Sequence, residues 1–225
     1  MSHLRQIGAA IGTLVAILGS IVFISWKYFN GSRRHSEEEY SFIQEVKDRE
    51  LSQPREKQIL VLGLDGAGKS SILNCLATHT VKHSTSPTQG FNAVCVHTEG
   101  CKLDFLEIGG SCNLRSYWNL YLNKAQMLIY VVDSADQERL PLARQELHRL
   151  LKEDPMVPLL LLAHKQDLDG ALTMSDLHRK LLLHDRNYEQ KLFLMATNVT
   201  EDGTEIPESI HNVKELIIQL ISQKS

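Results

Sequence analysis

The sequence has few cysteines and no excess of charge of either sign. Its four cysteines, Cys75, Cys95, Cys101 and Cys112, form no C-x-x-C pair and no metal-ligand spacing. We therefore expect free thiols, and neither a disulfide framework nor a zinc site. The formal net charge of −3 gives no electrostatic basis for binding nucleic acid. The composition, 43% hydrophobic and 23% charged, suits one globular domain with additional segments.

Charged residues are also absent from one long segment, residues 7–26. Its length is about that of a helix that spans a bilayer. Arg5 is the only Arg or Lys before it, whereas Lys27, Arg33 and Arg34 follow it, so the positive-inside rule places the C-terminal side in the cytosol. We therefore predict an N-terminal membrane anchor over residues 1–30, with a transmembrane helix at about 7–26 and the rest of the chain facing the cytosol.

A cleaved signal peptide is the competing interpretation of this segment. The apolar stretch is longer than is usual for a signal peptide, and no A-x-A-like cleavage site follows it. Myristoylation is not expected because position 2 is Ser2 and not glycine. The small residues Gly8, Gly12 and Ala16 would line one face of the helix and allow self-association, although glycine is also common in membrane helices in general.

The next segment, residues 31–54, is rich in charged and poor in apolar residues. Ser36 and Glu39 have the spacing of a capping box and predict a short stalk helix that ends before Pro54. A disordered linker is the alternative. We expect the folded domain to occupy residues 55–225, which is long enough for one hydrophobic core.

Within this domain, apolar runs typical of strands alternate with helical periodicity. The runs lie at residues 58–62, 93–96, 103–108, 127–132, 158–163 and 192–195. Helical patterns follow the first run and recur at residues 140–151, 174–181 and 210–221, with Thr173 at one helix start. The alternation predicts an α/β domain with a mostly parallel six-stranded sheet and helices on both faces. Glu99-Gly100 predicts a hairpin, so that one strand is antiparallel.

The first strand leads into a phosphate-binding motif. Residues Gly63 to Ser70 match G-x-x-x-x-G-K-[ST], in which glycines let the backbone N–H groups face phosphate. Lys69 would reach the β- and γ-phosphates, and Ser70 would bind Mg²⁺. A plain glycine-rich turn is the alternative, but the flanking strand and helix favour phosphate binding. The candidate contacts are Asp65, Gly66, Ala67, Gly68, Lys69, Ser70 and Ser71.

Further candidates come at the ends of later strands, where ligands bind in such folds. The hydroxyl of Thr88 can complete the Mg²⁺ shell, and Glu107 can hold its water ligands. The N–H of Gly110 can contact the γ-phosphate. Asp167 can accept from two guanine N–H groups, and Lys165 can pack over the base. An isolated K-x-D motif is weak evidence for a base-binding site. Here it follows a phosphate loop in the chain, and that order favours guanine binding.

With these motifs in place, residues 57–222 resemble the Arf family of small GTPases, and most of all its Arf-like nine and ten subgroup, nearer to nine. The resemblance implies a GTP/GDP and Mg²⁺ switch whose loops near Thr88 and Gly110, with the hairpin between them, rearrange with the γ-phosphate. It also implies effectors, exchange factors and activating proteins as partners. The effector face maps onto Phe91, Leu106 and Tyr121, and the anchor would replace the family's reversible membrane attachment.

The chain departs from the family at residues that matter for chemistry. Ser111 stands where the family has a water-orienting Gln after Gly110, so we expect very slow hydrolysis. Glu107 replaces Asp, and its extra methylene would push the carboxylate toward the metal site or force it aside. His164 replaces an Asn that holds the phosphate loop and touches guanine.

The last guanine motif is ambiguous. Ala196-Thr197 matches it by composition, whereas alignment on Asp202-Gly203 places Thr197-Asn198-Val199 there.

Three functions therefore compete. The first is a membrane-anchored GTP-binding switch with slow hydrolysis. The second is a pseudo-GTPase, an interaction module that has lost nucleotide cycling because Glu107, Ser111 and His164 depart together. The third is a kinase or ATPase on the same loop, against which Lys165 and Asp167 argue. We favour the first.

Overall fold

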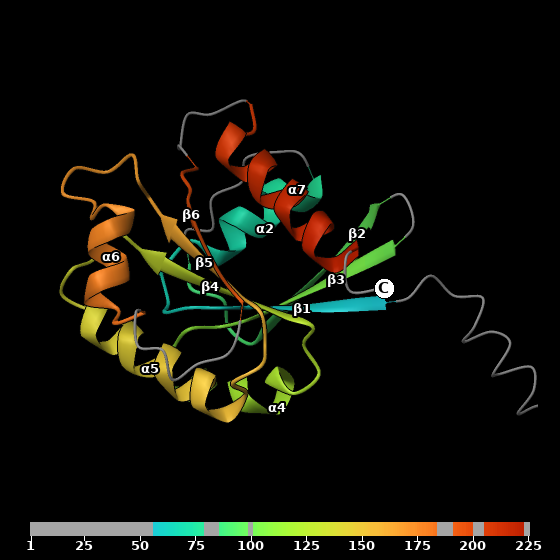
Figure 1. Ribbon diagram of the computed structural model, residues 1–225, viewed down its shortest axis with the longest axis horizontal. Coiled ribbons are helices and arrows are strands. Elements are labelled where there is room, and N and C mark those ends of the chain that lie inside the picture. Colours follow the sequence, from blue (N-terminus) through green and yellow to red (C-terminus); the bar gives the residue numbers. More distant parts are fainter. Residues whose placement is uncertain (1–55, 79–85, 99–100, 184–190, 200–204, 223–225) are drawn as a thin grey trace, which may run out of the picture. The chain divides into compact units, whose positions relative to one another are not determined.

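The structure is a computed structural model, and it describes residues 56–78, 86–98, 101–183, 191–199 and 205–222. A six-stranded sheet in the order β2-β3-β1-β4-β5-β6 forms the centre of the domain (Figure 1). The strands are β1 (Glu56–Leu62), β2 (Phe91–Thr98), β3 (Cys101–Ile108), β4 (Met127–Asp133), β5 (Leu159–His164) and β6 (Leu192–Ala196). All neighbouring strands run parallel except β2 and β3, which confirms the predicted sheet and its one antiparallel strand.

Helices cover both faces of this sheet (Figure 1). On one face lie α2 (Lys69–Thr78) and α7 (Glu208–Ser222), whose apolar residues share a core with Ile59 and Val61 of β1. On the other lie α4 (Trp118–Leu122), α5 (Leu140–Glu153) and α6 (Met174–Lys180), packed with Leu60 and Leu62. Successive residues of β1 thus face opposite cores, as expected for a strand buried on both sides.

Some helices have clear local causes and others do not. Thr173 caps α6 as predicted, because its side chain accepts a hydrogen bond from the Asp176 N–H. The short helices α3 (Cys112–Arg115) and α4 were not predicted. Burial of Trp118 fixes α4: its ring is fully buried and makes an edge contact with Tyr130 at 6.4 Å between ring centroids.

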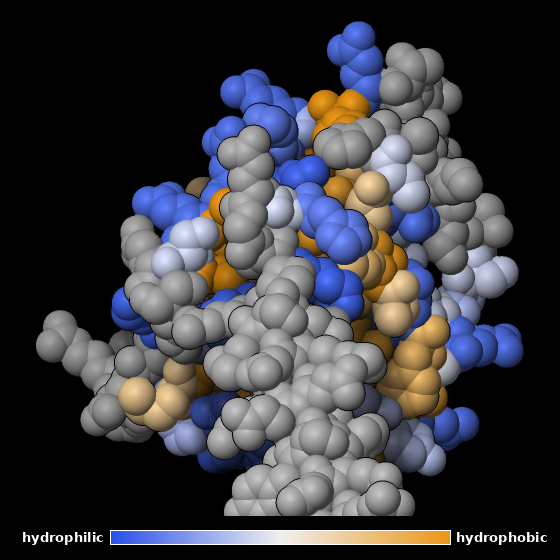
Figure 2. Space-filling model, turned by 90° about the vertical axis from the view of Figure 1, so that its right-hand side faces the viewer, coloured by the Kyte–Doolittle hydropathy of each residue, from blue (hydrophilic) through white to orange (hydrophobic). Residues whose placement is uncertain are grey.

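Apolar side chains also reach the surface. Figure 2 shows one side of the molecule, where hydrophobic residues appear between hydrophilic ones. Among the described residues, the exposed large hydrophobic side chains include Phe91, Tyr117 and Leu120. Cys75 and Cys112 are free thiols, as expected.

The predicted anchor and stalk, residues 1–54, lie outside the described residues, and so does the small-residue face at Gly8, Gly12 and Ala16. Across the described ranges from residue 56 onward, no helix combines the length and the apolar character that crossing a bilayer requires. The transmembrane helix therefore stays a prediction.

Candidate nucleotide-binding site

The phosphate loop joins β1 to α2 in a conformation that only glycine adopts readily. Gly63, Gly66 and Gly68 all have φ between 75° and 145°. A Cβ at Gly63 would collide with the Val131 carbonyl, and one at Gly68 with the ring of His164. The glycines are therefore required both by the turn and by the close approach of two other strands.

Lys69 is buried at the start of α2, with its side chain folded over the loop. Its ammonium donates to the carbonyls of Gly63 and Leu64 at 3.1 and 3.0 Å. Burial lowers the pKa of Lys69 to about 8, although the carboxylates of Glu107 and Asp65 oppose the shift. The predicted phosphate-binding cation thus lies within the loop. Ser71, another candidate nucleotide contact, is also buried.

The three predicted metal residues come together from three separate segments. Ser70 Oγ lies 2.9 Å from Thr88 Oγ1, and both hydroxyls donate to Glu107 Oε1, at 2.7 and 3.0 Å. Glu107 is fully buried, and its other oxygen accepts from Asn92 Nδ2 at 3.1 Å. The extra methylene of Glu107 was expected either to push its carboxylate toward the candidate metal site or to force it aside. In the structure the carboxylate points toward Ser70 and Thr88 at that site.

This arrangement fits Mg²⁺. Oxygens at adjacent corners of an octahedron with bonds of 2.0–2.1 Å lie about 2.9 Å apart, which is the separation of the Ser70 and Thr88 hydroxyl oxygens. With both protons directed at Glu107, the two hydroxyls present lone pairs to a cation. No cluster of three or more His, Cys, Asp or Glu in the described ranges could hold a metal.

The predicted γ-phosphate contact follows β3 directly. A Cβ at Gly110 would collide with the backbone of Asp65 and Leu64, so this segment lies against the phosphate loop. Arg115 Nε donates to the Gly110 carbonyl at 2.7 Å, and Trp118 Nε1 donates to the Gly109 carbonyl at 3.2 Å. These two side chains therefore hold the Gly109-Gly110 loop in place.

Ser111 is the first residue after the paired glycines and precedes α3. Its backbone is extended, and its side chain makes no capping hydrogen bond. The hydroxyl is short and half-buried. The Ser111 side chain is too short to reach the position that the amide of a Gln would occupy.

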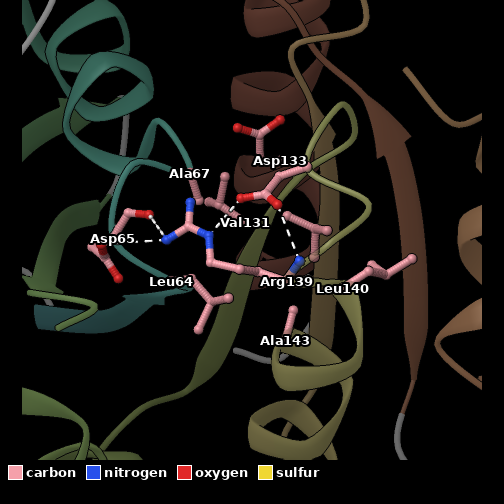
Figure 3. A pocket seen from close by; sticks show the side chains of 10 residues that line it. Leu64, Asp65, Ala67, Val131, Asp133, Arg139, Leu140 and Ala143 are labelled. Carbon is pink, nitrogen blue, oxygen red and sulfur yellow. Dashed lines mark hydrogen bonds and ion pairs between the residues drawn. The ribbon is translucent and has the colours of Figure 1, made fainter. Parts of the chain in front are cut away.

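Two arginines flank the carboxylate of Asp65 in the phosphate loop. Figure 3 shows one of them, Arg139, pointing toward Asp65. Arg139 donates to its carbonyl and to its carboxylate at 3.2 and 3.3 Å, and is itself held by Asp136 at 2.6 Å. Arg115 approaches the same carboxylate at 3.7 Å. Sequence reasoning missed Arg139, which is 74 positions away from Asp65 in the chain and belongs to no recognised motif.

The predicted guanine-binding residues lie in the turn after β5. Lys165 has a left-handed backbone with φ of 61°, and its ammonium contacts Asp133 at 2.6 Å. Left-handed backbone is uncommon for residues other than glycine and is concentrated at functional sites. Asp167 is exposed, so its carboxylate is accessible to a ligand. Asp133, the last residue of β4, orients Lys165.

His164 occupies the position between the phosphate loop and the β6 loop. It is buried, and its Nδ1 lies 3.0 Å from Thr197 Oγ1. Thr197 is also buried, and its carbonyl accepts from the Gln166 N–H. Ala196 is the last residue of β6 and pairs with Ala163. The loop after Thr197 therefore adjoins the Lys165 turn, and Ala196 belongs to the sheet.

The predicted effector face is partly assembled. Phe91 is half exposed and packs against Tyr121, with ring centroids 5.4 Å apart. Leu106 and Tyr121 both pack against the same core as α5. Tyr117 and Leu120 add exposed apolar side chains next to Tyr121 in sequence.

Comparison with known proteins agrees with this site. The model of the ADP-ribosylation factor family matches residues 43–217. The chain is 52% identical over 166 residues to ADP-ribosylation factor-like protein 9 of Homo sapiens, covering 74% of this chain and 89% of the relative. It is 37% identical to ADP-ribosylation factor-like protein 10 of Mus musculus, covering 95% of this chain and 96% of the relative.

A solved structure is similar as well. The Arl6 BBS3 small GTPase of Trypanosoma brucei, with the bound nucleotide analogue GppNp, superposes with a TM-score of 0.64 at 25% identity. It covers 76% of this chain and 99% of its own. The family model spans most of the chain, and both relatives align with it over most of their own length. This chain belongs to the ADP-ribosylation factor family of small GTPases.

Proposed function

We propose that the chain is a membrane-anchored guanine-nucleotide switch that binds GTP or GDP with Mg²⁺ and hydrolyses GTP very slowly. One observation carries this proposal: Ser70, Thr88 and Glu107 converge beside Lys69 in a glycine-rich loop. When bound, Mg²⁺ would neutralise phosphate charge. Ser70 and Thr88 would hold it, with Glu107 behind them.

Guanine selectivity rests on the turn after β5. Lys165 is held by Asp133, and the exposed carboxylate of Asp167 can accept from the two N–H groups that guanine presents and adenine lacks. This geometry argues against a kinase or ATPase on the same loop.

Slow hydrolysis rests on Ser111. In GTPases a Gln at this place orients the attacking water, and a serine hydroxyl is too short to do so. Arg115 is close by, but it is occupied by the Gly110 carbonyl and by carboxylates of Asp65 and Glu146. It therefore supports the loop and does not replace the Gln.

A pseudo-GTPase is the second candidate. It is favoured by one observation: the ring of His164 fills the space between Gly68 and Thr197, where the family's Asn contacts both the loop and the base. Loss of a buried hydrogen bond there would weaken nucleotide binding by roughly ten- to a hundredfold.

The anchor and the partners complete the proposal. The apolar segment 7–26 would hold the protein in a membrane with the GTPase domain in the cytosol. Exchange factors, activating proteins and effectors would bind the switch segments, with effectors on the face of Phe91, Leu106 and Tyr121. Self-association through Gly8, Gly12 and Ala16 is a further expectation.

Thermal stability in the presence of nucleotides tests the central part. After bound nucleotide has been removed, we expect GTP with Mg²⁺ to raise the Tm of the wild type and ATP with Mg²⁺ to leave it unchanged. Asp167→Ala should lose the GTP effect without loss of fold, since its side chain is exposed. Asp169→Ala, an exposed carboxylate two residues away, is the matched control. A Tm that no guanine nucleotide shifts would sink the proposal and favour the pseudo-GTPase.

A further inference from the structure

Glu107 connects two segments that a nucleotide switch needs to move apart. One of its oxygens accepts from Ser70 at the start of α2 and from Thr88 before β2, at 2.7 and 3.0 Å. The other accepts from Asn92 in β2 at 3.1 Å. Two of its three hydrogen bonds therefore go to the segment containing Thr88 and Asn92, and the third goes to the phosphate-loop helix.

The length of the side chain makes these contacts possible. An Asp at position 107 would be shorter by one carbon–carbon bond, about 1.5 Å. The 3.0 Å contact between Glu107 Oε1 and Thr88 Oγ1 would then exceed hydrogen-bond distance unless the backbone moved. The replacement of the family's Asp by Glu thus adds a direct bond from β3 to Thr88.

The pairing of β2 with β3 makes the same contacts specific to one register. Asn92 stands directly opposite Glu107. A slide of β2 that keeps each face must move by two residues, which would bring Gly90 or Val94 opposite Glu107. Neither has a side-chain donor, and a fully buried carboxylate would lose hydrogen bonds. Glu107 therefore favours the register and the Thr88 position of this structure.

We propose that Glu107 is a positioning residue that holds the segment from Thr88 to Asn92 against Ser70 whichever nucleotide is bound, so that this part of the switch stays closed with GDP as well as GTP. This inference rests on the proposed guanine-nucleotide site. It departs from the rearranging hairpin expected for the family. Its consequence is that partners contacting only this segment would not distinguish the two nucleotide states, so effectors that do distinguish them would also contact the loop at Gly110.

Amide hydrogen exchange of the full-length protein tests this. We would compare peptides covering residues 86–98 in samples with Mg²⁺ and either GDP or GTPγS. The wild type should exchange in this segment at rates equal within about twofold. Glu107→Asp, the family's residue, should exchange about tenfold faster with GDP and at the wild-type rate with GTPγS. Asn92→Ala, which removes one donor from a half-buried position, should fall between them.

Glu153→Asp is the matched control, since it shortens an exposed carboxylate at the end of α5 and should change nothing. Strong nucleotide dependence in the wild type would overturn the inference, as would a Glu107→Asp variant that exchanges like the wild type. The nucleotide content of each sample is measured in parallel. Protein without nucleotide would refute the proposed function alone, and the faster exchange of Glu107→Asp relative to wild type would still test the role of Glu107.

Discussion

The ring of His164 lies directly against the backbone of Gly68: its Nε2 is 2.6 Å from the place where a Cβ at residue 68 would be. His164 also bonds Thr197. One imidazole thus joins the phosphate loop to the loop after β6, which are the two places where a nucleotide's phosphates and base would bind. The site's stability and its affinity should both depend on this contact.

We predict that Gly68→Ala abolishes measurable nucleotide binding and lowers the Tm. The added methyl meets the His164 ring, and the backbone has φ of 94°, which costs about 1–2 kcal/mol for residues with a Cβ. Gly170→Ala is the matched control, since Gly170 has φ of 77° but open space around it. If both variants lose the same stability and affinity, the His164 contact is unimportant. Fluorescent-nucleotide titration and thermal unfolding provide the two measurements.

His164→Asn should tighten guanine-nucleotide binding by about tenfold, because the family's Asn hydrogen-bonds both the phosphate loop and the base, whereas the His164 ring contacts Gly68 and Thr197. Equilibrium binding of labelled GDP at constant Mg²⁺ measures the change. His211→Asn, on the exposed surface of α7, should leave affinity unaltered. An unchanged affinity in His164→Asn would show that the histidine is not a defect of the site.

Ser111→Gln should accelerate GTP hydrolysis, by about tenfold or more, by restoring a side chain that can orient water. Single-turnover phosphate release from preloaded protein gives the rate directly. The comparison variant is Ser116→Gln, at an exposed position just beyond α3. Equal rates in the two variants would mean that Ser111 does not occupy the catalytic Gln position.

From the lowered pKa of Lys69 we predict that nucleotide affinity falls as pH rises, whereas the stability of the nucleotide-free fold increases. Its pKa in the folded protein is about 8, lowered by burial from 10.5. Phosphates require the ammonium form, so binding takes up a proton and affinity should fall above pH 8 by up to about tenfold per pH unit. The unfolded chain keeps its proton up to 10.5, so the nucleotide-free fold should gain stability between these two values.

Nucleotide titrations and denaturant unfolding between pH 7 and about pH 9.5 check both trends. Lys69→Met should remove the rise in stability. If nucleotide affinity stays constant across this range, the lysine does not titrate as its burial requires.

Local patterns made much of the fold predictable. The phosphate loop, the strands buried between the two cores and the Thr173 cap all depend on residues close together in sequence. The extent of β2 did not follow, because its residues alternate between exposed and half-buried and only four of them formed an apolar run. Pairing with β3 extends the strand to Phe91–Thr98.

The candidate site was predictable where motifs name the residue, as for Lys69, Ser70, Thr88 and Asp167. The contacts that hold these residues in place could not be predicted from the sequence. Asn92 meets Glu107, and Arg139 meets Asp65, through side chains brought together by the sheet and by α5. No pattern of hydrophobic spacing encodes such pairs, since they depend on three-dimensional register and not on sequence separation.

The nucleotide content of the purified protein tests the central claim most directly. Full-length protein would be isolated with Mg²⁺, denatured, and its released nucleotide identified by chromatography and quantified against protein. We predict close to one guanine nucleotide per chain, most of it GTP because Ser111 slows hydrolysis. Bound GDP alone would contradict slow hydrolysis, and a folded protein without any nucleotide would contradict the guanine-nucleotide switch itself.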